Sequence, residues 1–353
     1  MPEIIIQNPA ITNANPKQAL GAATKPCWKT ELATAFSRPS DLLEFLSLPP
    51  ERRPRHWEPV REFPLRVTAA FARRIKKGDP DDPLLRQVLP LAEEQAHWAG
   101  HTADPVGDLG AVAVPGLLHK YHGRALLIAT GTCAIHCRYC FRREFPYAES
   151  QLTRSRYAEA IAYLARDASI AEVILSGGDP LLLDDGRLAD LMTDIAAIPH
   201  VIRLRIHSRL PIVLPSRITP DFTRVIVGTR LKPVMVIHAN HANELDAEVG
   251  HALQGLRRAG VVLLNQSVLL KGVNDTLAAL TDLSESLFNH GVLPYYLHLL
   301  DKAKGTGHFD LPEPTALALH QAMRRHLPGY LVPKLVREVA GAAYKLSPTG
   351  GCD

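Results

Sequence analysis

One pattern repeats six times over the last two-thirds of the chain and limits its fold more than any other feature. From about residue 124 onward, a short apolar run is followed by a loop and then by an amphipathic stretch. The apolar runs predict strands at residues 125–129, 173–175, 201–206, 234–237, 261–264 and 295–300. Because each strand returns through a helix, the strands must form a mainly parallel sheet. Two α/β architectures stay open, a doubly wound open sheet and a (β/α) barrel.

The amphipathic stretches between these strands are typical of helices with one buried face. The expected buried positions are Tyr157, Ile161, Leu164, Leu188, Leu191, Met192, Ile195, Leu245, Val249, Leu253, Leu256, Leu280, Leu283 and Leu287. Upstream, proline-punctuated helices are expected at 28–36, 39–48 and 65–77. The predicted units are therefore an N-terminal helical segment (1–105), an α/β core (106–330) and a C-terminal segment (331–353).

Charge and hydropathy exclude several classes of partner. Lys and Arg number 40 and Asp and Glu number 36, and the net charge of +4 is too small to favour nucleic acid or a membrane surface. The sequence has no run of roughly 18 apolar residues and no targeting signal at its start. We expect a cytoplasmic protein that acts on a small molecule, and a homo-oligomer is compatible with the sequence.

Polar residues gather where the predicted strands end. In both architectures, the carboxyl ends of parallel strands carry the functional groups. These positions hold Cys133, Cys137, Cys140, Ser176, Gly177, Gly178, Asp179, His207, Ser208, Arg209, His238, Asn240, His241, Asn265, Gln266 and Asp301. Among them we expect residues 176–179, His238 and Gln266 to bind a cofactor.

Three of the five cysteines lie within eight residues, in GTCAIHCRYCFRR at 131–143. Disulfides explain so tight a group poorly. Thiolates at Cys133, Cys137 and Cys140 can bind three irons of a cubic cluster and leave the fourth open. S-adenosylmethionine (SAM) can chelate that iron through its amino and carboxylate groups. The alternative is a zinc site completed by His136 or a distant residue, although the sequence offers no second pair of ligands.

The strand after the cysteine loop ends in SGGDP, at 176–180. Two glycines let the backbone approach a ligand closely. We expect the backbone carbonyls and the carboxylate of Asp179 to receive the amino group of SAM. The alternative is a turn that only ends a strand.

Several motifs, in order, resemble the radical SAM enzymes and, within them, the lysine 2,3-aminomutases. The motifs are CAIHCRYCFRR, LSGGDPLL, RIHSRLPIVLPSRIT, IHANHANE, LNQSVLLKGVND, PYYLHLLD, GTGHF and GYLVPK, over roughly residues 110–348. The resemblance implies a partial (β/α)6 barrel that binds a [4Fe-4S] cluster, SAM and pyridoxal 5′-phosphate (PLP). The N-terminal part is similar to the shorter branch that acts in β-lysylation of elongation factor P.

The resemblance also assigns the lysine that binds PLP covalently. In PKLVREVAGAAYK (333–345) it corresponds to Lys345, which we expect to be catalytic. The family has a run of glycines before this lysine, whereas here Gly341 stands alone and predicts a stiffer loop. Lys334 is the alternative. Lys120 lies where the family has an arginine against the PLP phosphate, a change that keeps the charge and loses the bidentate fork.

Substrate positions follow from the same resemblance. Asp301 and Glu338 match two carboxylates that bind the side-chain ammonium of lysine, through hydrogen bonds that gain strength away from water. Arg142 matches the residue that holds the substrate carboxylate. Without the family, Glu338 would be interpreted as a surface residue, and Arg142 as a solvated arginine or as a neighbour that tunes the cluster.

The resemblance implies conversion of L-α-lysine into (R)-β-lysine, which in the elongation factor P branch a separate lysyl ligase attaches to that factor. The sequence lacks the cysteine-bearing C-terminal extension of the catabolic enzymes, and this favours the elongation factor P branch over a catabolic aminomutase. Two further alternatives are a zinc-holding protein without catalysis and a radical SAM enzyme that acts on RNA without PLP.

Overall fold

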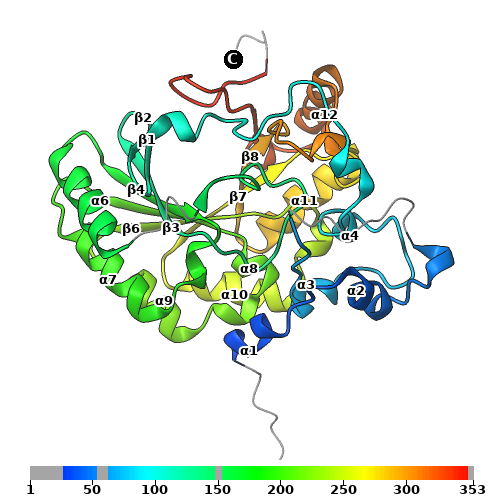
Figure 1. Ribbon diagram of the computed structural model, residues 1–353, viewed down its shortest axis with the longest axis horizontal. Helices are drawn as coiled ribbons and strands as arrows, with labels where there is room; N and C mark the ends of the chain where they lie inside the picture. Colours follow the sequence, from blue (N-terminus) through cyan, green and yellow to red (C-terminus); the bar gives the residue numbers. More distant parts are fainter. Residues whose placement is uncertain (1–26, 54–62, 148–152, 349–353) are drawn as a thin grey trace, which may run out of the picture.

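A single sheet organises the chain in the computed structural model, which describes residues 27–53, 63–147 and 153–348. Its strands follow one another in sequence order (Figure 1). They are β1 (Val112–Val114), β2 (Leu117–Tyr121), β3 (Arg124–Thr130), β4 (Glu172–Gly177), β5 (Arg203–Ser208), β6 (Lys232–Ile237), β7 (Val262–Val268), β8 (Leu293–His298) and β9 (Lys334–Val336). β1 to β3 pair antiparallel, and all pairs from β3 to β9 are parallel. An order without reversal is that of a partial (β/α) barrel and rules out the doubly wound sheet.

The six predicted strands are all present, as β3 to β8, with boundaries that differ by a few residues. β1, β2 and β9 were not predicted. β1 and β9 have only three residues each, too few for a hydrophobic period to stand out. β2 (LLHKY) pairs with β3 through the turn at Gly123, whose φ of 76° suits glycine.

Helices pack outside the parallel strands (Figure 1). The longest are α6 (Arg154–Arg166), α7 (Asp185–Ala196), α10 (Ala247–Arg258), α11 (Leu277–Asn289) and α12 (Glu313–His326). Each of α6, α7, α10 and α11 begins after a Thr or Asp whose side chain accepts a hydrogen bond from a first-turn N–H. The predicted apolar faces of these four helices are buried or packed against the core, although Leu245 precedes α10.

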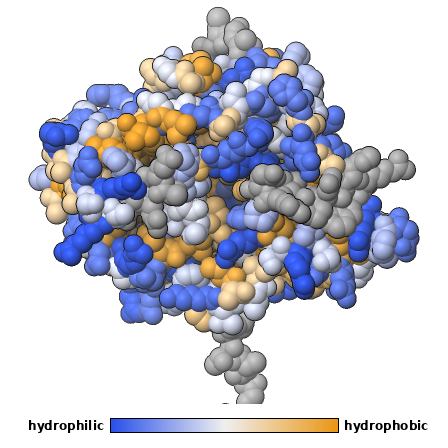
Figure 2. All heavy atoms as spheres, viewed as in Figure 1, coloured by the Kyte–Doolittle hydropathy of each residue, from blue (hydrophilic) through white to orange (hydrophobic). Residues whose placement is uncertain are grey.

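Among the described residues, four α-helices were not predicted: α4 (Pro83–Arg86), α8 (Leu210–Val213), α9 (Pro220–Ile226) and α12. Among the helices of the described ranges, none is long and apolar enough to cross a membrane. The surface in Figure 2 mixes hydrophilic and apolar side chains, and a hollow opens near the centre of this face.

The N-terminal part contains the short helices α1 (Trp28–Ala33), α2 (Pro39–Phe45), α3 (Ala69–Ala72) and α4 (Pro83–Arg86). The prediction of a helix over 65–77 was wrong. Val67 pairs with Phe36 in a β-bridge, and the Thr68 side chain caps the first turn of α3, so the helix begins late and ends after one turn. The apolar side chains of this part join the barrel in one core. The division at residues 105 and 330 stays a prediction.

Candidate active site

A cavity of about 720 Å³ lies inside the partial barrel, and its lining runs from the amino ends of the strands, at Arg124 and Arg203, to their carboxyl ends. It is lined by every residue that the sequence assigned to a metal, cofactor or substrate: Cys133, Cys137, Cys140, Lys120, Ser176, Gly177, Gly178, Asp179, His238, Gln266, Arg142, Asp301, Glu338 and Lys345. The alternative lysine, Lys334, is exposed on β9. The structure therefore brings the predicted residues into one chamber of a size that suits small molecules.

The three cysteines of the loop after β3 line this chamber together. Burial raises the pKa of Cys133 and brings that of Cys140 to about 11, and the neighbouring cysteines add to both rises. Binding to a metal reverses this cost, because a coordinated thiol is deprotonated. His136, the fourth ligand of the zinc alternative, instead directs Nδ1 to the carbonyl of Pro64 at 2.8 Å. In the described part of the chain, no three Cys, His, Asp or Glu side chains converge on a single ion, whereas a cubic cluster spreads its thiolates over three irons.

The N-terminal part fixes the cysteine loop from outside. Arg138, between the second and third cysteines, donates to Glu94 at 2.8 and 2.5 Å and to the carbonyl of Phe63 at 2.7 Å. Arg143 donates to the same Glu94 at 2.8 Å. The backbone N–H of Arg138 donates to the carbonyl of Gln87 at 2.9 Å. The sequence predicted no role for the N-terminal part. In the structure, its residues Phe63, Gln87 and Glu94 hold the cysteine loop from outside.

The two glycines after β4 allow the SGGDP turn to lie directly against the cysteine loop. Gly177 has a φ of 122°, and a Cβ there would lie 2.4 Å from the carbonyl oxygen of Thr130. A Cβ on Gly178 would lie 2.1 Å from the carbonyl oxygen of Thr132. The hydroxyl of Tyr147 donates to the carbonyl of Gly177 at 2.8 Å. Only glycine fits both positions, and the reason seen here is the close packing of the turn against the backbone of the cysteine loop. The approach of this backbone to a ligand stays a prediction.

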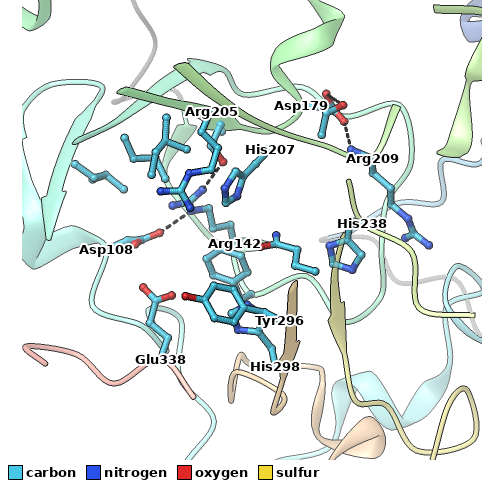
Figure 3. Close-up of a pocket in the computed structure, with 18 of the residues that line it drawn as sticks. Asp108, Arg142, Asp179, Arg205, His207, Arg209, His238, Tyr296, His298 and Glu338 are labelled. Atoms are coloured by element: carbon cyan, nitrogen blue, oxygen red, sulfur yellow. Dashed lines mark hydrogen bonds and ion pairs between the residues drawn. The ribbon is translucent and has the colours of Figure 1, made fainter. Parts of the chain in front are cut away.

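Asp179 has a structural role that the sequence did not indicate. Its carboxylate accepts hydrogen bonds from Ser208 Oγ (2.8 Å) and from the backbone N–H groups of Leu181 (3.1 Å), Arg209 (2.8 Å) and Leu210 (3.2 Å). Burial nevertheless raises the pKa of Asp179 to about 6, against these hydrogen bonds. The carboxylate joins the ends of β4 and β5 (Figure 3), and its oxygens are already engaged by four donors.

The opposite side of the chamber holds a chain of alternating charges (Figure 3). Buried Asp108 binds Arg142 Nε at 2.6 Å through one oxygen and Lys120 Nζ at 2.6 Å through the other. Lys120 also binds Glu338 at 3.0 Å, and Glu338 in turn accepts a short hydrogen bond from Lys345. Burial opposes the ionisation of Glu338, but the two lysines outweigh it and lower its pKa to about 2. The ion pairs thus form one continuous chain of the predicted residues Arg142, Lys120, Glu338 and Lys345. Asp108, which was not predicted, connects Arg142 to Lys120.

Asp301 stands beside this chain without an ion-pair or hydrogen-bond partner for its carboxylate among the described residues. Burial and, to a smaller extent, the charge of Glu338 raise the pKa of Asp301 to about 7, although Lys345 and Lys120 act in the opposite direction. The group therefore titrates near neutrality. A cation bound between Asp301 and Glu338 would favour the ionised form.

Lys345 reaches the chamber because the chain doubles back after β9. The backbones of Arg337 and Leu346 exchange two hydrogen bonds, of 2.7 and 2.9 Å, and Gly341 lies in the connecting turn. Gly341 has a φ of 78°, so the one glycine of this stretch occupies a position that needs its conformational freedom.

Three histidines line the chamber at the ends of the central strands: His298 is buried, and His207 and His238 are half-buried. Loss of solvation is the first cause that lowers the pKa of each, to about 3 for His238 and His298 and well below its ordinary value for His207. All three are therefore neutral at pH 7. Among the described residues, the Nε2 atoms of His207 and His298 have no hydrogen-bond partner, and Tyr139 contacts Nε2 of His238 at 3.1 Å.

Sequence reasoning missed Asp108, Gln87 and the contact that Arg209 makes with a cysteine. Arg209 Nη1 lies 2.7 Å from Cys137 Sγ. Arg209 was noted at a strand end, but its partners come from segments far away in the chain. Asp108 precedes the first antiparallel hairpin, where no apolar period singles it out.

Comparison with known proteins places this geometry in a family. A family model described as the radical SAM superfamily matches residues 127–218, which include the cysteine loop and the SGGDP turn. The chain is 46% identical over 327 residues to a protein of Escherichia coli named L-lysine 2,3-aminomutase, covering 92% of this chain and 95% of the relative. A protein of the same name from Haemophilus influenzae is 47% identical, with 90% of this chain and 94% of the relative covered. For the one from Clostridium subterminale, identity is 34%, with 90% and 76% covered. The chain belongs to the L-lysine 2,3-aminomutase family of the radical SAM superfamily.

Proposed function

We propose that this chain is a radical SAM, PLP-dependent lysine 2,3-aminomutase that converts L-α-lysine into (R)-β-lysine. The observation that carries the proposal is the shared chamber, in which three cysteine thiols face a set of paired lysines, carboxylates and an arginine. The name of the relatives at 46% and 47% identity supports the same reaction. When bound, the cluster with SAM supplies one-electron chemistry that removes a hydrogen atom from an unactivated carbon, and PLP supplies a conjugated ring that delocalises electrons.

The residues of the chamber fit these cofactors. Cys133, Cys137 and Cys140 would hold the [4Fe-4S] cluster, and the carbonyls of Gly177 and Gly178 would face the amino group of SAM. We assign SAM binding to these backbone groups rather than to the carboxylate of Asp179, which is engaged by four donors. His238 and Gln266 line the same side of the chamber and would contact cofactor there.

Lys345 would be the lysine that carries PLP, with Lys120 beside the phosphate. In the structure Lys345 donates to Glu338, and Lys120 has three partners, Glu338, Asp108 and the carbonyl of Val106. Once Lys345 is covalently occupied, it no longer neutralises Glu338. Glu338 is then free to bind another cation, so loading of the lysine prepares the substrate site.

The substrate would lie between two charged ends. Asp301 and Glu338 would hold the side-chain ammonium, which replaces the cation that Glu338 loses. Arg142 would hold the carboxylate: its Nε is taken by Asp108 and its Nη1 by Ser176 at 3.2 Å, while Nη2 has no hydrogen-bond partner among the described residues. Asp108 thus orients the guanidinium, and the wall of the barrel excludes water from the carbon between the two ends.

The finer proposal is that the product supplies β-lysylation of elongation factor P. The support for it is the resemblance of the N-terminal part to the shorter branch, because the relatives at 46%, 47% and 34% identity all bear the same name. The test is to give the product to the lysyl ligase with elongation factor P and to measure the mass of the factor. An unmodified factor would exclude this link and leave the aminomutase reaction standing.

The decisive experiment uses anaerobically reconstituted protein with SAM, PLP, a strong reductant and L-lysine, and measures β-lysine by mass spectrometry. We expect product from the wild type and none from Lys345→Ala. Lys334→Ala is the matched control, because Lys334 is exposed on β9, and it should keep full activity. A wild type that cleaves SAM but leaves lysine unchanged would contradict the aminomutase assignment, and activity on RNA with Lys345→Ala would favour the enzyme without PLP.

A further inference from the structure

We propose that Arg209 is a positioning residue that raises the reduction potential of the iron-sulfur cluster by donating a hydrogen bond to the thiolate of Cys137. This inference rests on the proposed function only in that the three cysteines hold a cluster. It concerns a residue outside the cysteine motif, directly after β5, which is separated by β4 from the strand β3 that precedes the cysteine loop.

The contact between Arg209 and Cys137 is built rather than incidental. Arg209 is 7% exposed, and its Nη1 lies 2.7 Å from Cys137 Sγ. Its Nη2 donates to Gln87 Oε1 at 2.7 Å and to Glu244 Oε2 at 2.9 Å. Its backbone N–H is held by Asp179 at 2.8 Å. Four contacts from four separate segments therefore fix the direction in which the guanidinium points.

The partners of Arg209 are themselves fully buried and held in place. Glu244 Oε1 accepts from the backbone N–H groups of Asn240 (2.8 Å) and His241 (3.1 Å) and from Gln87 Nε2 (3.0 Å). Gln87 Oε1 also accepts from Asn240 Nδ2 at 3.1 Å. Glu244 and Gln87 are each 0% exposed. A surface arginine that touched a thiol by chance would not be held by a buried, fully hydrogen-bonded network of this kind.

A fixed cation at a ligand sulfur has a definite electrostatic consequence. Reduction adds an electron to the cluster and its thiolates, and a positive group in a poorly solvated site stabilises that added charge. Hydrogen bonds to the sulfurs, net charge and solvent exposure set the potentials of such clusters. Arginine keeps its charge at any working pH. The guanidinium should therefore favour the reduced cluster, the state that gives an electron to SAM.

The same site makes the cluster asymmetric. In the described part of the chain, neither Cys133 nor Cys140 receives a hydrogen bond from a guanidinium. The positive charge therefore acts at the corner of the cluster that Cys137 holds. Because Gln87 supports Arg209, the N-terminal part of the chain contributes to this tuning as well.

The test compares wild type, Arg209→Lys, Arg209→Met and the double variant Arg209→Met/Glu244→Gln, which removes the buried charges together. Anaerobically reconstituted protein is titrated with reductant, and the reduced fraction is followed by electron paramagnetic resonance. Iron and sulfide content are measured in parallel. Arg74→Lys is the matched control, because Arg74 is a buried arginine that binds the backbone of the same Glu244 without touching a cysteine.

We expect the ratio of reduced to oxidised cluster at fixed reductant to fall at least tenfold in the charge-removing variants, which for one electron corresponds to about 59 mV. Arg209→Lys should fall less, and Arg74→Lys should match the wild type. An unchanged ratio in variants with normal iron content overturns the inference, as does loss of iron in both charge-removing variants, which makes Arg209 purely structural. A wild type that binds no cluster overturns the proposed function as well.

Discussion

The two sides of the chamber are built in opposite ways. On the cluster side, three cysteines lie within eight residues, and glycine backbones and the buried pairs of Arg138 and Arg143 with Glu94 hold their loop. On the other side, Asp108, Lys120, Arg142, Glu338 and Lys345 come from distant segments and pair with one another. The first arrangement needs to stay as it is when its ligand binds. Under the proposed function, the second would exchange partners, because Lys345 could not keep its contact with Glu338 and also carry PLP.

The largest effect should come from the fixed side. Cys137→Ala removes one of three thiolates, so we expect no cluster and no β-lysine above background. Iron content and absorbance near 400 nm measure the loss directly. Ser208→Ala is a suitable control: it removes one hydrogen bond to Asp179 and leaves every thiol in place. A brown, iron-loaded Cys137→Ala protein would show that the loop does not hold the cluster.

A smaller but still large effect is expected at the exchanging side. Arg142→Lys keeps a positive charge but loses the fork that serves Asp108, Ser176 and the substrate carboxylate at once. The loss of one charge-assisted hydrogen bond should reduce kcat/KM for lysine roughly 10- to 100-fold. The cluster spectrum should not change. If the spectrum changes as much as the activity does, the two sides are not independent.

The pH dependence should expose Asp301. Because its pKa is about 7 in the absence of substrate, it is protonated below that pH and cannot bind the ammonium of lysine as an anion. In the wild type, kcat/KM should therefore fall as the pH decreases through about 7. In Asp301→Asn, kcat/KM should be low at every pH and should not show this fall near pH 7. If kcat/KM of the variant fell in the same way as the pH decreased through about 7, the titrating group would not be Asp301.

The smallest predicted effect tests whether the N-terminal part stabilises the chamber through the hydrogen bonds of Gln87. Gln87→Ala leaves Arg209, Asn240 and Glu244 each without one buried hydrogen-bond partner, and we expect a loss of about 2 kcal/mol in the free energy of unfolding. Urea denaturation of the apoprotein measures it. Arg38→Ala, at an exposed ion pair, should change stability by less than about 0.5 kcal/mol. If Gln87→Ala and Arg38→Ala had equal free energies of unfolding, the hydrogen bonds of Gln87 would not stabilise the fold, and the prediction would be wrong.

The same contrast explains how far the sequence could be interpreted. The six strands and the cysteine loop were predictable, because apolar runs and the cysteine motif depend only on residues that are close together in the sequence. The family resemblance supplied Lys345, Glu338 and Arg142, whose neighbourhood depends on segments that meet only after folding. Asp108 and Gln87 were missed because their roles depend on partners that are not local: Arg142 lies 34 residues from Asp108, and Arg209 lies 122 residues from Gln87. The helix expected at 65–77 failed because a long-range bridge between Phe36 and Val67 overrides its local pattern.

The hairpin between residues 337 and 346 gives this molecule a modular character. Glu338 and Lys345 both lie on it, at the edge of the sheet, after the last parallel strand. The strands that surround the cysteine loop need nothing from it to pair. Under the proposed function, the cysteine loop and the residues that would carry the second cofactor therefore occupy separable pieces of chain. Replacement of the hairpin alone would then change the second half of the chamber and leave the cysteine loop and its supporting strands as they are.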